Sequence, residues 1–327
     1  MKTLYTVSEV STMINNGETL LLSGDERALT NLPKGKWIAG TTPYFMSEEK
    51  GGIFTHDEIQ VVKLPSMITD FTMKTYSVNE LKNIPKDYLP NGFSYIIIPA
   101  FSDALINFAK DCSSYEGLFD RPLIGWVSGV DLAEVEKSKA KVIDGMTGEI
   151  TDSKAVVMHL NLPADKYAKI NKINLFKQGN GDSITFNSPG FEISECKVNG
   201  IDTNFYDYIS SHIDTKLPLV ADYMGAMINV SIQDIDTVSK KIILFAPVFP
   251  GIEYKIAKPV ADYEKEFAAE LSKANISPLF SCNCILNYHY AHLEGKKTGH
   301  IVGPMTFGEI AYMLLNQTMV YVTLEDK

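Results

Sequence analysis

The segment from Phe93 to Pro99 reads Phe-Ser-Tyr-Ile-Ile-Ile-Pro, one of the longest apolar runs in the chain. A run of this length without polar alternation is typical of a strand whose two faces are both covered. Ser102 follows as a helix N-cap, and Leu105, Phe108 and Ala109 then recur at helical spacing. The sequence therefore predicts a central strand followed by a helix with one apolar face.

Further strands and helices are predicted on both sides of this pair. Three serine or threonine residues are followed three positions later by glutamate, a pattern that indicates a helix start. Several strands follow one another without a helix between them, which favours an α+β fold with mixed β-sheets flanked by helices. Strands are predicted at 19–23, 37–40, 59–64, 122–127, 140–144, 155–162, 226–232, 241–246, 253–257, 281–287 and 317–324, and helices at 7–15, 103–112, 204–212, 262–275 and 306–315.

The composition changes between Pro163 and Gly190, where Lys, Asn and Gly become frequent. A chain of 327 residues can hold one large unit or two of ordinary size. We therefore expect two related or tightly associated halves at 1–165 and 185–327, joined by a connecting segment at 166–184.

The charge and the apolar runs exclude several kinds of partner. The formal net charge is −10, so the surface repels phosphate backbones and a nucleic-acid partner is not expected. No run reaches the roughly 18 apolar residues of a membrane span, and the N-terminal residues do not resemble a signal peptide. We expect a cytoplasmic protein with no membrane partner, whose four cysteines are reduced thiols.

Four potential metal ligands lie within eleven residues: Cys282, Cys284, His289 and His292. Such donors can bind zinc, but their spacing differs from that of the usual zinc sites. A cysteine nucleophile would need a base, and no local signature supplies one. Buried structural cysteines are the favoured interpretation. No phosphate-binding loop follows a strand, so no cofactor is predicted.

Thr41, Thr42 and Tyr44 follow the end of a predicted strand, where side chains often line ligand pockets in α/β sheets. Turn chemistry around Pro43 is the alternative explanation. Glu309 is a further binding candidate, although its position three residues after Thr306 also fits a capping box.

The later part of the chain resembles the C-terminal segment of the FIST sensory family, and the earlier part resembles its N-terminal segment more loosely. The later similarity is an ordered series of short matches. They are Val198-Asn199-Gly200-Ile201-Asp202, Asp234-Ile235-Asp236 with Lys241 to Phe245, Val248 to Ala257, Phe280-Ser281-Cys282, and Gly303 to Ile310 followed by Asn316-Gln317-Thr318. The earlier matches are Trp37 to Thr42, Tyr95 to Pro99 and Pro122 to Gly129.

The resemblance implies a sensory protein that binds a small molecule such as an amino acid or a related metabolite, and that signals through a separate partner protein. The family commonly has an arginine shortly after its cysteine, where this chain has Asn283-Cys284. A catalyst is less expected than a binding protein. The alternatives are a cysteine- or metal-dependent enzyme using residues 282–292, or a non-catalytic interaction module. The expected ligand-binding residues are Thr41, Thr42, Tyr44, Ser281, Cys282, Asn283 and Glu309.

Overall fold

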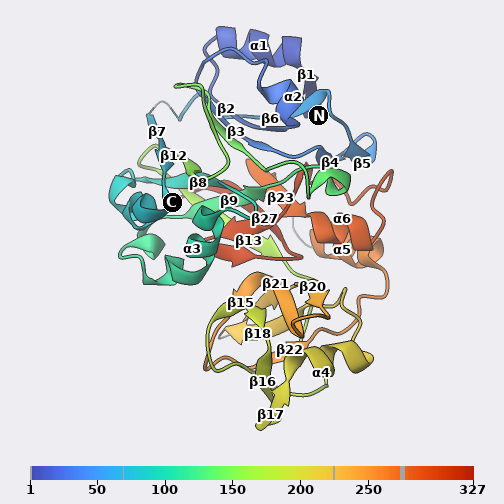
Figure 1. Ribbon diagram of the computed structural model, residues 1–327. Coiled ribbons are helices and arrows are strands. Elements are labelled where there is room, and N and C mark those ends of the chain that lie inside the picture. Colours follow the sequence, from blue (N-terminus) through green and yellow to red (C-terminus); the bar gives the residue numbers. More distant parts are fainter. Residues whose placement is uncertain (1, 69, 224, 273–276) are drawn as a thin grey trace.

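The computed structural model describes residues 2–68, 70–223, 225–272 and 277–327. The described strands form four six-stranded sheets and one three-stranded sheet, and helices pack against them. The predicted α+β class is confirmed. Three of the sheets stack in a main body, and the other two form a smaller unit at the bottom of Figure 1.

The central sheet contains β8 (Gly92–Pro99), the strand predicted from its apolar run. It pairs in parallel with β9 (Leu123–Ser128) and antiparallel with β12 (Ala155–Asn161). Because side chains alternate between the faces of a strand, Ile96 and Ile98 pack on one side of the sheet and Tyr95 and Ile97 on the other. The sheet order is β26-β25-β9-β8-β12-β7, with β7 at Phe71–Tyr76, β25 at Glu309–Ala311 and β26 at Met313–Leu315.

Helical segments cover one face of the central sheet. Helix α3 (Asp103–Asp111) starts where predicted, since Ser102 Oγ accepts a hydrogen bond from the Leu105 N–H. Its buried residues join the same cluster as Ile96 and Ile98. Short 3₁₀ helices complete this layer: η1 (Val78–Asp87), η2 (Cys112–Ser114) and η3 (Leu118–Asp120), while η4 (Leu132–Glu134) follows β9.

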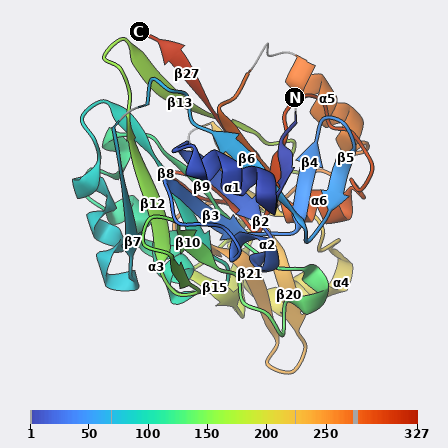
Figure 2. The same ribbon diagram turned by 90° about the horizontal axis from the view of Figure 1, so that it is seen from above.

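A second sheet packs on the opposite face of the central one and contains β2 (Leu20–Gly24) in parallel with β3 (Trp37–Thr41). Helix α1 (Val7–Asn15) lies across its outer face, as Figure 2 shows, and begins at the predicted capping box of Thr6 and Glu9. The order is β1-β6-β2-β3-β10-β11, with β1 at Leu4–Thr6, β6 at Glu58–Lys63, β10 at Val142–Asp144, β11 at Glu149–Thr151 and the short α2 at Glu26–Leu29.

The third sheet of the main body carries the end of the chain. Its strand β23 (Phe280–Cys284) pairs with β27 (Met319–Asp326) and leads directly into helix α6 (Ile285–Tyr290). Helix α5 (Tyr263–Ser272) lies beside α6 (Figure 1). The order is β13-β27-β23-β24-β4-β5, with β13 at Lys166–Ile173, β24 at Gly303–Thr306, β4 at Tyr44–Ser47 and β5 at Gly51–Phe54.

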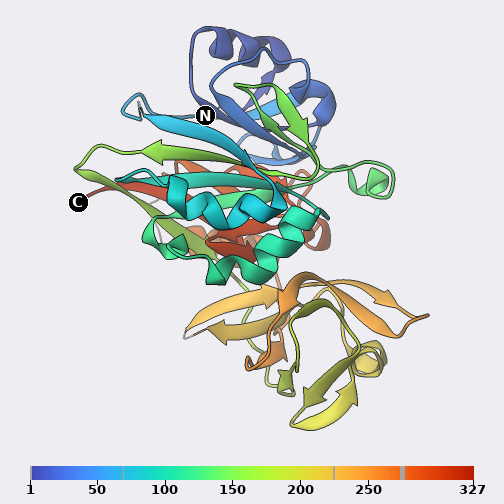
Figure 3. The same ribbon diagram turned by 60° about the vertical axis from the view of Figure 1, so that its left-hand side comes forward.

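Residues 184–256 form the smaller unit, called here the β unit. Figure 3 shows the helices near residue 100 between the central sheet and the β unit, and one hydrophobic cluster spans both. Its six-stranded sheet has β14 (Ile184–Thr185), β16 (Glu195–Val198), β17 (Ile201–Asn204), β18 (Leu219–Tyr223), β19 (Ala226–Val230) and β22 (Tyr254–Ile256). Its three-stranded sheet has β15 (Gly190–Ile193), β20 (Ile232–Asp236) and β21 (Lys241–Val248), and α4 spans Phe205–His212.

The chain enters and leaves the β unit through two adjacent segments. The Gly179 N–H donates to Ile256 O, and the Lys258 N–H donates to Lys177 O, each at 2.9 Å. Before and after this double crossing, the chain belongs to the main body, in β13 and α5. Strands on both sides of the expected connecting segment share sheets, since Glu309 of β25 pairs with Trp126 of β9. Residues 166–173 of that segment form a strand paired along its length with β27.

Two predicted elements differ from the structure. The predicted helix at 306–315 is wrong: β25 and β26 form a hairpin there, reversing at Tyr312, whose φ is 62°. Pairing with β9 buries Ile310 in the core, and this tertiary packing overrides the helical pattern. The predicted strand at 281–287 ends at Cys284, where α6 begins. The predicted helix at 262–275 is observed as α5, and residues 273–276 lie outside the described ranges.

Across the described ranges, no helix combines the length and the apolar character that crossing a lipid bilayer requires.

Candidate functional site

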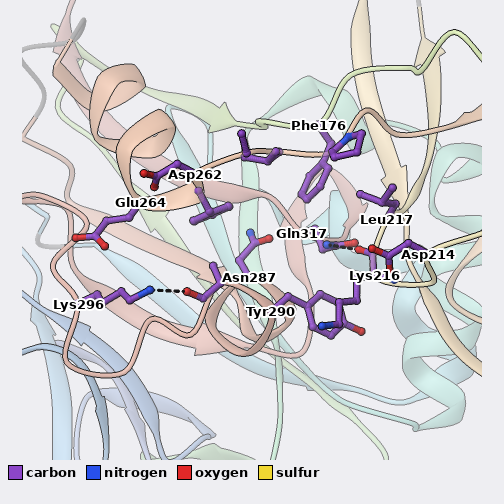
Figure 4. A pocket seen from close by; sticks show the side chains of 15 residues that line it. Phe176, Asp214, Lys216, Leu217, Asp262, Glu264, Asn287, Tyr290, Lys296 and Gln317 are labelled. Atoms are coloured by element: carbon purple, nitrogen blue, oxygen red, sulfur yellow. Dashed lines mark hydrogen bonds between the residues drawn. The ribbon is translucent and has the colours of Figure 1, made fainter.

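A pocket of about 510 Å³ lies where the β unit meets α5 and α6 of the main body. Figure 4 shows the side chains that line it. Asp214, Lys216 and Leu217 come from the loop before β18. The other walls come from both crossing segments, from α5, from α6 and the loop after it, and from Gln317 just before β27. The complete lining is Phe176, Asp214, Lys216, Leu217, Pro259, Val260, Ala261, Asp262, Tyr263, Glu264, Asn287, Tyr290, Ala291, Lys296 and Gln317.

The start of α5 forms one wall of the pocket and is held by two local interactions. Asp262 Oδ1 accepts a hydrogen bond from the Lys265 N–H at 3.0 Å, as a helix-capping side chain does. The Tyr263 ring stacks on Phe267, with 5.5 Å between the ring centroids. The Tyr263 hydroxyl is consequently fixed near the end of β23.

A chain of buried hydrogen bonds starts at the pocket and leads into the main body. The Asn287 amide donates to Asn283 Oδ1 at 2.9 Å, and Asn283 Nδ2 donates to the Tyr263 hydroxyl at 3.3 Å. Thr306 Oγ1 lies 3.2 Å from the backbone carbonyl oxygen of Asn283 and 3.0 Å from Glu309 Oε1. Two pocket residues, Asn287 and Tyr263, are thus connected to Glu309 through Asn283 and Thr306.

Glu309 is fully buried at the inner end of this network. Its other partners are also neutral: the Thr318 N–H, at 3.3 Å from Oε2, and the Cys284 thiol. Burial in these surroundings raises the pKa of Glu309 well above its ordinary value, despite the hydrogen bonds that lower it. The burial therefore favours the neutral, protonated form of this side chain. It does not line the pocket directly.

The pocket carries charges of both signs. Figure 4 shows Asp262, Glu264 and Lys296 on one side and Asp214 and Lys216 on the other. Both lysines have partners within the protein. Lys216 Nζ lies 5.8 Å from the centroid of the Tyr290 ring, and Lys296 Nζ donates to the Ala291 carbonyl oxygen at 3.1 Å.

The expected residues Thr41 and Thr42 line a different cavity, of about 320 Å³, at the ends of β3 and β9. Thr41 Oγ1 donates to Gly129 O at 2.8 Å, and Thr42 Oγ1 donates to Met305 O at 2.9 Å. The Tyr44 hydroxyl donates to Asp131 Oδ1 at 3.0 Å. These three side chains are therefore engaged in holding neighbouring segments together.

Ser281, Cys282 and Asn283 border a void of only about 10 Å³, too small for a metabolite. Ser281 Oγ donates to Val302 O at 2.7 Å, and Cys282 Sγ lies 3.7 Å from Gly125 O. Of the seven expected residues, Asn283 and Glu309 belong to the network behind the larger pocket. The structure does not bring all seven into one cavity.

The four sulfur and nitrogen donors of residues 282–292 do not converge. Cys282 and Cys284 are buried in β23, whereas His289 and His292 are exposed at and beyond the end of α6. Burial raises the pKa of both thiols well above the ordinary value, which disfavours the nucleophilic thiolate. In the described part of the chain, no three His, Cys, Asp or Glu side chains are grouped closely enough to hold a metal ion.

Sequence reasoning missed Asn287, Tyr263 and the loop residues Asp214 and Lys216. Asn287 falls at the end of a segment read as a strand, and the structure instead has a helix from Ile285. Asn283 lies in β23 and Asn287 in α6, so their contact forms at the junction of a strand and a helix, which no regular spacing in the sequence signals.

Comparison with known proteins adds a family but no activity. Residues 5–325 match a family of unknown function, DUF6976. No curated protein matches the chain.

Proposed function

We propose that this chain, which belongs to the DUF6976 family of unknown function, binds a small polar molecule in the pocket between the β unit and helices α5 and α6. The observation that carries the proposal is the position of this pocket, which is lined by polar groups from two parts of the protein. Ligand pockets are commonly concave sites of this size, found where structural units meet, with a few converging polar groups.

The lining suits a metabolite with both polar and apolar parts. Phe176, Leu217 and Val260 supply apolar contacts, while Asn287 offers its amide oxygen. Charges of both signs favour a zwitterion, such as an amino acid or a related metabolite. The resemblance to FIST sensory domains extends this proposal to a cytoplasmic signalling role, in which a separate protein receives the signal.

A cysteine- or metal-dependent enzyme is a weaker alternative. It would require the residues around Cys282 to reach a substrate, and both cysteines of β23 are buried with raised thiol pKa values. The binding role does not need a reactive group.

The first test is a thermal-shift screen of the purified chain against amino acids, other small metabolites and divalent metals. A ligand that binds the folded state raises the melting temperature, by an amount equivalent to about 2.7 kcal/mol at a hundredfold excess over its Kd. We expect a hit among the metabolites. A hit restricted to metals would contradict the proposal.

The pocket assignment is tested by matched lysine substitutions. Lys216→Met alters the pocket lining at an exposed position, and Lys82→Met alters a similarly exposed lysine that lines a separate cavity. Affinity for the hit should fall in Lys216→Met and stay unchanged in Lys82→Met. Equal affinities in both variants would place the ligand elsewhere.

A further inference from the structure

The side-chain amide of Asn283 has a defined orientation. Its Oδ1 accepts a hydrogen bond from the Cys284 N–H at 2.8 Å, and a backbone N–H can only donate. The atom at this position is therefore the oxygen. The amide nitrogen is on the other side, where it donates to the Tyr263 hydroxyl. The backbone thus decides an orientation that would otherwise have to be chosen between two alternatives.

The orientation of Asn283 determines that of Asn287. Because Asn283 Oδ1 can only accept, the group of Asn287 that faces it must be the amide nitrogen. Asn287 Oδ1 is then turned away from Asn283, and none of the residues that the structure describes donates a hydrogen bond to it. The Asn287 side chain is 2% exposed and lines the pocket. This oxygen is therefore free to accept a hydrogen bond from a molecule bound in the pocket.

The charges around the pocket point to the same kind of ligand. Three carboxylates, Asp214, Asp262 and Glu264, line it together with two lysines, Lys216 and Lys296. Both lysines interact with protein groups already, Lys216 with an aromatic ring and Lys296 with a carbonyl oxygen. The pocket therefore has a formal excess of negative charge, which favours a cationic ligand group over an anionic one.

We infer that the ligand binds through a protonated amine, which donates a hydrogen bond to Asn287 Oδ1. Asn283 is a positioning residue: it does not line the pocket, and it presents the oxygen of Asn287 to the ligand by holding the nitrogen. This inference rests on the proposed function and adds the chemical class of the group that the site recognises. Two independent observations support it: the oxygen of a pocket-lining asparagine without a donor among the described residues, and the charge of the lining.

The test compares three probes with the same four-carbon chain: butylamine, butyrate and 1-butanol. Binding is measured by ligand-observed NMR and by competition with any hit from the thermal-shift screen. We expect butylamine to bind roughly tenfold or more tighter than butyrate, in line with a hydrogen bond between charged and neutral groups. Equal binding of the amine and the acid, or a preference for butyrate, would overturn the inference.

Substitutions separate positioning from folding. Asn283→Leu should abolish the preference for butylamine, whereas Asn283→Asp should keep it, because the carboxylate still accepts from Asn287 and from the Cys284 N–H. Asp262→Asn provides a fold-safe check, since asparagine also caps a helix, and it should weaken butylamine binding alone. Asn287→Leu removes the accepting oxygen itself and should also abolish the preference for butylamine. Asn79→Leu, at an exposed position in a separate cavity, should keep it.

The two proposals fail in different ways. If no four-carbon probe binds but another metabolite binds and is sensitive to Lys216→Met, the amine inference is wrong and the pocket assignment stands. If no small molecule binds at all, both are wrong.

Discussion

Thr306 Oγ1 lies 3.0 Å from Glu309 Oε1, and both residues are fully buried. The sequence pattern that suggests a capping box is thus realised as a side-chain contact next to a β-hairpin. In a helix cap the glutamate would be exposed and ionised. In this structure the carboxyl group is enclosed by neutral partners, and its protonation is coupled to folding.

Glu309 should make the protein less stable as the pH rises. Its pKa is raised in the folded state from an ordinary value of 4.5, so the folded protein retains a proton that the unfolded chain releases. The stabilisation is complete below pH 4.5 and declines as the pH rises toward the folded-state pKa, by up to about 1.4 kcal/mol per pH unit. Urea unfolding between pH 5 and pH 9 should show this decline.

The variant Glu309→Gln is the control for this effect, because glutamine resembles the neutral acid but does not titrate. Its free energy of unfolding should depend less on pH than that of the native sequence. Identical pH dependence in the two proteins would show that Glu309 is ionised in the folded state.

His159 should act in the opposite sense at lower pH. Its ring lies between Ser94 Oγ, 2.7 Å from Nδ1, and the Tyr76 hydroxyl, 2.8 Å from Nε2, and burial lowers its pKa from 6.5 to about 4. The unfolded chain then binds a proton that the folded protein excludes. Stability contributed by the neutral ring is present above pH 6.5 and is lost as the pH falls toward 4, by about 3 kcal/mol in total.

This loss is measured by urea unfolding between pH 4 and pH 7, and His159→Gln should remove most of the slope. Using Glu309→Gln as the background isolates the histidine, since the two groups titrate over overlapping ranges. A pKa near 6.5 for His159, measured by NMR in the folded protein, would contradict the prediction.

Gly40 should not tolerate a side chain. A methyl group on its Cα would lie 2.6 Å from Ile97 Cγ2 and 2.8 Å from Trp126 Cη2, in the interface between β3 and the central sheet. Gly40→Ala should therefore lower the free energy of unfolding by about 1–3 kcal/mol. Gly181→Ala is the matched control, because nothing lies within 4 Å of its added methyl group. Equal stabilities would mean that the two sheets can separate slightly without cost.

The four cysteines should react slowly with a thiol reagent in the native state. All four are buried and free, and burial raises the pKa of Cys112 to about 12 and that of Cys196 to about 11. Titration with a chromogenic disulfide should detect few reactive thiols before urea is added. After unfolding in urea, it should detect four thiols per chain. Rapid reaction of one thiol in the native protein would revive the hypothesis of a nucleophilic cysteine.

Short-range sequence patterns correctly predicted the helices and strands that are signalled by an apolar run or by capping residues next to them in the chain. Three such features appear as expected: the strand β8 at its apolar run, the N-cap of α3 at Ser102, and the capping box of Thr6 and Glu9 at the start of α1. The hairpin of β25 and β26 could not be read in the same way, because its pairing partner β9 is almost two hundred residues earlier. The pocket had no sequence signature, since its walls come from five separate segments, at 176, 214–217, 259–264, 287–296 and 317, that only folding brings together.

The double crossing of the chain has a mechanical consequence. Phe176 lies immediately before the first crossing and Val260 immediately after the second, and both residues line the pocket. The connection between the β unit and the main body and one wall of the cavity are therefore built from the same few residues. Any movement of the β unit relative to the main body would deform the cavity. A molecule bound in the cavity would therefore oppose that movement.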